Sequence, residues 1–136
     1  MEKNNKIIAE FLEWDFDELS ETFETPFLKL VEPHAFGDEQ FSCKLKDFEL
    51  DFNKDWNWLM AVVEKITSIL MLDDNFKYNY LYIGYDFEDK EHYVNLYVSE
   101  DNQINGTSKT SKIEAVYEAV VKFINFYNKR KEEEIN

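Results

Sequence analysis

The segment from Lys77 to Glu100, KYNYLYIGYDFEDKEHYVNLYVSE, constrains the fold most, because both of its alternating faces are apolar or aromatic. Its two runs surround a short turn, which is the pattern of a β-hairpin. One face carries the tyrosines Tyr78, Tyr80, Tyr82, Tyr93 and Tyr97. The other face carries Leu81, Ile83, Tyr85, Phe87, Val94, Leu96 and Val98. A sheet with one wet face alternates apolar with polar residues, so we expect helices to cover both faces of this sheet.

Three segments with helical periodicity are available as cover. The first runs from about Asn4 to Trp14, the second follows Asp55 and the third follows Ser111. Asp55 and Ser111 are typical helix N-caps, and Glu114 completes a capping box with Ser111. The expected buried stripe of the second helix is Trp56, Leu59, Met60, Val63, Ile66 and Leu70. That of the third helix is Ile113, Val116, Tyr117, Val120, Phe123, Ile124 and Tyr127.

Length and composition indicate a single domain. The chain has 136 residues, of which 44% are hydrophobic and 17% aromatic, so it can bury one core. We predict one α+β domain over residues 1–136, an antiparallel sheet sandwiched between helix layers, with a frayed tail at 129–136. Residues 15–25 are expected to form a loop or a short helix, 26–30 a strand, and 41–52 short or bulged strands. Asn105-Gly106 is expected to be a turn.

Residues with catalytic or metal-binding chemistry are few. The single cysteine, Cys43, and the two histidines, His34 and His92, are widely separated, whereas structural zinc needs four ligands, usually in close pairs. The acidic turns at 15–17 and 86–89 lack the central glycine and final glutamate of a calcium loop. We therefore expect no catalytic residues, no metal and no cofactor, with the histidines on the surface and a buried thiol.

The net charge of −14 restricts the partners. Such a chain is repelled by nucleic acids and by anionic membranes, while a basic protein remains a possible partner. There is no apolar run near 18 residues and no signal peptide, so we expect a cytoplasmic protein without membrane contact.

The acidic residues gather near the start of the chain. Between Lys6 and Lys29 there are seven acids and no base, namely Glu10, Glu13, Asp15, Asp17, Glu18, Glu21 and Glu24. Such runs are most often solvated surface. Spaced carboxylates can also mimic nucleic-acid charge and occupy the basic groove of a nucleic-acid-binding protein. Trp58, two residues from Trp56 and off the predicted stripe, is expected either to cover a strand edge or to stand exposed as a candidate interface anchor.

The helical segments carry a resemblance. IIAEFLEW near the start, DWNWLMAVVEKI from Asp55 to Ile66 and SKIEAVYEAVVKFINFYN from Ser111 to Asn128 resemble a family of small proteins encoded by phages and prophages. That family is described as a phage α-β-α sandwich domain. The resemblance covers these three segments alone, and it implies a sheet between helix layers and a phage context but no particular activity.

Two functions remain open, and an enzyme is the least favoured class. The first is a small acidic phage-encoded protein that inhibits a host nucleic-acid-binding defence protein, as an anti-CRISPR-type inhibitor of an RNA-guided nuclease. It would act in the infected bacterial host, by protein–protein contact or by charge mimicry. The second is a ligand-binding or sequestering module that uses the tyrosines as an exposed aromatic platform. Cover over the tyrosine face distinguishes the two.

Overall fold

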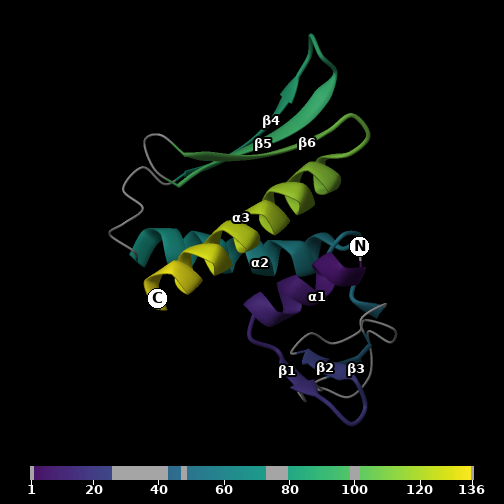
Figure 1. Cartoon of the computed structure of the whole chain (residues 1–136). Helices are drawn as coiled ribbons and strands as arrows, with labels where there is room; N and C mark the ends of the chain where they lie inside the picture. Colours follow the sequence, from purple (N-terminus) through teal and green to yellow (C-terminus); the bar gives the residue numbers. More distant parts are fainter. Residues whose placement is uncertain (1, 26–42, 47–48, 73–79, 99–101, 136) are drawn as a thin grey trace. The chain divides into compact units, whose positions relative to one another are not determined.

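The structure, a computed structural model of the chain, describes residues 2–25, 43–46, 49–72, 80–98 and 102–135 (Figure 1). The chain divides into two compact units, Met1–Asp51 and Phe52–Asn136. Each contains helix and a three-stranded antiparallel sheet. The predicted α+β class with layered helices and sheets is thus confirmed, whereas the single-domain organisation stays a prediction.

The first unit contains one helix and three short strands. These are α1 (Glu2–Phe11), β1 (Asp15–Asp17), β2 (Thr22–Thr25) and β3 (Cys43–Leu45), and the strand order is β1-β2-β3. Phe16 pairs with Phe23, which pairs with Leu45 on the next strand, and the last two side chains are buried. The buried Asn5 donates a hydrogen bond from Nδ2 to the Leu50 carbonyl oxygen at 2.9 Å, which ties α1 to the end of the unit.

The loop or short helix expected at 15–25 is wrong, because this segment forms the β1–β2 hairpin. In its turn Asp17 accepts a hydrogen bond from the Leu19 backbone nitrogen at 3.0 Å, and Glu21 takes a left-handed φ of 54°. The rings of Phe16 and Phe23 lie 4.9 Å apart across the strands. Strands of three or four residues are too short to show a clear alternation of apolar and polar residues in the sequence. Contacts between the strands therefore decide that this segment is β structure. The strand expected at 26–30 lies outside the described residues, and of the strands expected at 41–52 the structure describes β3.

The second unit contains α2 (Trp56–Leu72), β4 (Tyr80–Asp86), β5 (Glu91–Tyr97), β6 (Gln103–Ser108) and α3 (Lys112–Ile135). The predicted β4–β5 hairpin is confirmed, and β5 also pairs with β6. α3 packs against β5 and β6, and α2 packs against α3 (Figure 1). The turn expected at Asn105-Gly106 is wrong, because both residues lie within β6.

The N-caps of both long helices are formed as predicted. Asp55 Oδ1 accepts a hydrogen bond from the Asn57 backbone nitrogen at 2.8 Å. Ser111 Oγ accepts one from the Glu114 backbone nitrogen at 3.2 Å. In a reciprocal capping box the Glu114 carboxylate would accept a hydrogen bond from the Ser111 backbone nitrogen. Here it accepts one from the Thr110 hydroxyl at 2.6 Å.

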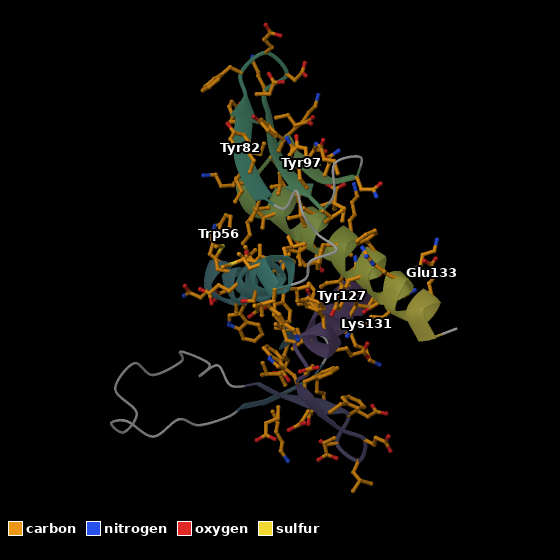
Figure 2. The ribbon with its side chains drawn as sticks, turned by 90° about the vertical axis from the view of Figure 1, so that its left-hand side faces the viewer. Trp56, Tyr82, Tyr97, Tyr127, Lys131 and Glu133 are labelled. Atoms are coloured by element: carbon orange, nitrogen blue, oxygen red, sulfur yellow. The ribbon has the colours of Figure 1, made fainter. Side chains whose placement is uncertain are left out.

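The predicted buried stripe of α3 is confirmed from Val116 to Ile124. The helix then continues to Ile135, through residues for which the sequence predicts fraying. One turn apart in this part of α3, the Lys131 Nζ lies 4.7 Å from the centre of the Tyr127 ring (Figure 2). This cation–π contact stabilises the helical geometry beyond the sheet. No helix in the described part of the chain has the length and apolarity to cross a membrane.

Candidate protein-binding surfaces

Strand register gathers carboxylates on one face of the β1-β2-β3 sheet. Asp15 pairs with Glu24, and Glu24 pairs with Lys44. Asp17 lies two residues beyond Asp15, so its side chain is on the same face. Three of the seven acids expected to form an interface therefore share this face, and they line a shallow hollow together with Thr22 and Lys44.

The carboxylates of this face are accessible to solvent. Asp17 Oδ2 lies 3.7 Å from the Lys44 Nζ, and both side chains are exposed. The hydrogen bond from the Leu19 backbone lowers the pKa of Asp17, and Ser20 and Lys44 act in the same direction. Asp15 and Glu24 lie directly opposite each other, an arrangement of like charges that does not favour strand pairing. The like charges of Asp15 and Glu24 therefore oppose the pairing of β1 with β2, whereas the ring contact of Phe16 with Phe23 favours it.

The other four predicted acids are also exposed. Glu10 lies on α1, Glu13 follows α1 with a φ of 62°, and Glu18 and Glu21 lie in the hairpin turn. Leu19 projects between these last two acids and is 99% exposed. A fully exposed leucine at an acidic tip is a potential apolar anchor that the sequence analysis missed. The turn geometry that exposes it follows from the pairing of Asp17 with Thr22.

A second candidate surface is the tyrosine face of the β4-β5-β6 sheet. Tyr82 and Tyr93 have ring centroids 5.8 Å apart, and a Cβ on Gly84 would lie 2.5 Å from the Tyr93 Cζ. The two rings therefore lie over the glycine. A hydrogen bond with the Tyr82 hydroxyl raises the pKa of Tyr93, and burial adds to this effect. Tyr82 and Tyr97 both extend from the sheet (Figure 2).

The expectation that a helix covers the tyrosine face is wrong at Tyr82, whose side chain is 51% exposed. Tyr93 and Tyr97 are half-buried. Tyr78 lies outside the described residues, as does the side chain of Tyr80. Tyr82 stays exposed because β6 adds polar side chains to this face, namely Gln103, Asn105 and Thr107. A face with polar residues along one edge needs no helix over it.

The buried stripe of α2 is shifted relative to the sequence prediction, so that it includes Trp58 and leaves Trp56 at its margin. Trp58, for which both a packed position and an exposed anchor were open, is 7% exposed, and its ring meets that of Phe52 edge to face at 5.4 Å. Trp56 and Met60, expected in the buried stripe, are each 39% exposed. Trp56 extends outward from α2 (Figure 2). Trp58 is therefore largely buried, and Trp56 is the more exposed of these two tryptophans.

In the part of the chain that the structure describes, no three or more histidine, cysteine, aspartate or glutamate side chains are grouped so that they could hold a metal ion. His34 lies outside that part, as does the side chain of Cys43. His92, expected on the surface, is half-buried, with its ring 4.8 Å from that of Tyr85.

Comparisons with known proteins find no match among protein-family models, curated proteins or solved structures. The resemblance to the phage α-β-α sandwich proteins therefore stays an expectation.

Proposed function

We propose that this chain is an acidic binding protein that occupies the basic groove of a nucleic-acid-binding protein. The surface that binds is the acidic hairpin, defined as Asp15, Asp17, Glu18, Leu19, Glu21 and Glu24. The observation that carries the proposal is the strand register, which places Asp15, Asp17 and Glu24 on one exposed face. Regularly spaced carboxylates on a short rigid hairpin can replace phosphates in a groove lined with lysine and arginine.

Electrostatics and apolar contact have separate roles in this binding. The net charge of −14 attracts a basic partner over a distance and accelerates association. The lowered pKa of Asp17 extends the ionised state of that carboxylate further into the acidic range. Leu19 at the tip supplies apolar surface that becomes buried only in the complex.

The partner class follows from the charge and from the resemblance. A protein that handles nucleic acids has the required basic groove, and occupation of that groove blocks its substrate. A phage context points to a host defence protein, of which an RNA-guided nuclease is the favoured case. The chain would then be a stoichiometric inhibitor in the bacterial cytoplasm rather than an enzyme.

The test neutralises four acids of the hairpin in one variant, Asp15→Asn, Asp17→Asn, Glu18→Gln and Glu21→Gln. Asparagine at 17 retains the oxygen that accepts the Leu19 hydrogen bond, so the turn is kept. A matched control removes the same charge elsewhere, at Glu88, Asp89, Glu132 and Glu133, which are all exposed. Both variants and the wild type are assayed for inhibition of a purified RNA-guided nuclease and for association rate at low and high salt.

The hairpin variant is expected to associate at least about tenfold more slowly and to show a weaker salt dependence. The control is expected to inhibit nearly as well as the wild type, and the thermal midpoints of all three are expected to agree, because surface carboxylates contribute little to stability. Equal inhibition by the two variants would place the binding surface elsewhere.

A second candidate function has one specific observation in its favour. Tyr82 is half exposed beside Tyr93 over the flat backbone of Gly84, which forms an aromatic platform for a planar ligand or a sugar ring. The negative charge of the chain disfavours phosphorylated ligands. The check is a titration with uncharged nucleosides and monosaccharides, observed through the Tyr82 and Tyr93 ring resonances. Tyr82→Ser is expected to abolish any response, and an unresponsive wild type would rule out these ligands.

A further inference from the structure

The two edges of the β4-β5-β6 sheet differ in how they are protected. At the β6 edge, Glu118 Oε2 of α3 accepts a hydrogen bond from the Thr107 backbone nitrogen at 3.1 Å. Lys122 Nζ donates to the Asn105 carbonyl oxygen at 2.9 Å and forms an ion pair with Glu118 at the same distance. The charged side chains of α3 thus form hydrogen bonds with backbone groups of β6 that an additional strand would otherwise pair with.

These contacts also reveal which backbone groups of β4 point away from the sheet, because pairing in an antiparallel sheet alternates from residue to residue. Since Asn105 and Thr107 face the open side of β6, their partners on β5, Asn95 and Tyr93, direct their backbone groups toward β4. Those groups bond to Tyr82 and Gly84. The residues between them, Leu81, Ile83 and Tyr85, therefore direct their N–H and C=O groups away from the sheet.

Among the described residues, the β4 edge has none of the usual protection. In the sheet as described β4 is the terminal strand, so no described strand pairs with its outer side. The run Tyr80–Tyr85, YLYIGY, has no charge and no proline, and its pairing with β5 contains no bulge. Leu81 and Tyr85 are 36% and 39% exposed. A regular, uncharged and partly apolar edge is a template for another strand.

We propose that β4 pairs antiparallel with β4 of a second copy of this chain, centred on Ile83, so that two three-stranded sheets join across a twofold axis. In this register the backbone groups of Ile83 pair with those of Ile83 in the other copy. Leu81 lies opposite Tyr85, and Tyr82 lies opposite Gly84. The strand is therefore complementary to itself, as an isologous interface requires, and the outward backbone groups of both strands are satisfied.

The uncharged edge of β4 favours a second copy as the occupant, because a basic peptide would find no acid to pair with between Tyr80 and Tyr85. With a net charge of −14, two copies repel each other over most of their surface. β4 is neutral from Tyr80 to Tyr85, and the proposed register places Asp86 opposite the uncharged Tyr80, so no acid meets an acid within the strand pair. The Asp86 carboxylate is also engaged in its own turn, accepting from the Glu88 backbone nitrogen at 2.9 Å. The other occupant, an extended basic peptide, is an outcome of the test.

The experiment measures the molar mass of the full chain by sedimentation over a range of concentrations. The two edge variants are Leu81→Lys, which adds a charge to the open edge, and Ile83→Pro, which removes an outward N–H without touching the β5 ladder. Gln103→Lys is the matched control, because it adds the same charge to the exposed β6 edge. Circular dichroism establishes that each variant is folded.

The wild type is expected to be a dimer whose dissociation constant rises at least about tenfold in each folded edge variant and is unchanged in Gln103→Lys. Amide exchange gives an independent readout, with protection at Leu81, Ile83 and Tyr85 increasing with protein concentration while protection at Tyr82 stays constant. A monomeric wild type overturns the proposal, whether or not an added lysine-rich extended peptide binds the edge. A dimer that Leu81→Lys leaves intact overturns it as well. The acidic hairpin plays no part in this pairing, so the inhibition assay can fail without affecting this result.

Discussion

Gly106 of β6 lies directly against the backbone of Ala115 in α3, so closely that no side-chain atom fits between the two elements. A Cβ built on Gly106 would collide with the Ala115 carbonyl oxygen and would lie 2.7 Å from the Ala119 backbone nitrogen. Ala115 and Ala119 are both buried. Small residues on the strand and on the helix thus bring α3 into contact with the sheet.

Gly106→Ala is therefore expected to lower the free energy of unfolding by about 3 kcal/mol, because the added methyl meets backbone atoms that cannot move alone. Gly84→Ala is the matched control. There the added methyl meets the rings of Tyr93 and Tyr82, which can turn aside, so the loss is expected to be smaller. Chemical denaturation measures both, and equal losses would contradict the close packing of α3 on β6.

The two tryptophans of α2 give a second prediction. Trp58→Ala is expected to cost about 3–5 kcal/mol, because a large buried ring leaves a cavity beside Phe52. Trp56→Ala is expected to cost much less than half of that, because its ring is partly exposed. Urea unfolding of the two variants checks the order. The reverse order would contradict the burial of Trp58 against Phe52.

The hydroxyl contact on the tyrosine face gives a third prediction. Tyr82→Phe removes the hydrogen bond that is the largest cause of the raised Tyr93 pKa, so the Tyr93 pKa is expected to fall. The titration is followed by the ring carbon resonance of Tyr93. Tyr127→Phe, in α3, is the control and is expected to leave the titration unchanged. A Tyr93 titration that is the same in all three proteins would show that the hydroxyls are not in contact.

A fourth prediction concerns alkaline pH. Burial raises the pKa of Tyr117 to about 12 from 10.0, so the folded state retains the phenol proton more strongly than the unfolded state. The corresponding stability is complete below pH 10.0 and is lost as the pH rises toward 12, at a rate of up to about 1.4 kcal/mol per pH unit. Tyr117→Phe has no such proton. Its free energy of unfolding is expected to decline less steeply than that of the wild type over this range, and parallel declines would argue against a buried phenol.

Local interactions determined the elements that could be predicted from the sequence. Asp55 and Ser111 cap α2 and α3 through backbone nitrogens two or three residues away, so their positions can be recognised without the fold. The β4–β5 hairpin is similarly local, since seven paired positions flank one short turn. The run of seven acids between Lys6 and Lys29 was also evident from the sequence, and the proposal of a basic partner starts from it.

Contacts between distant residues decided the rest. Asn105-Gly106 has the composition of a turn, but it is strand because α3 packs against Gly106. Phe23 makes β2 a strand through Leu45, a residue far along the chain.

The same holds for the candidate surfaces. Strand pairing, rather than spacing along the chain, determined which acids share a face, and the polar side chains of β6 determined that Tyr82 stays exposed. Helical periodicity defines a stripe but not its centre, so packing alone decided that Trp58 is buried and Trp56 is accessible. Periodicity and capping act over a few residues and can be read from the chain, whereas burial and register depend on which segments meet once the chain has folded.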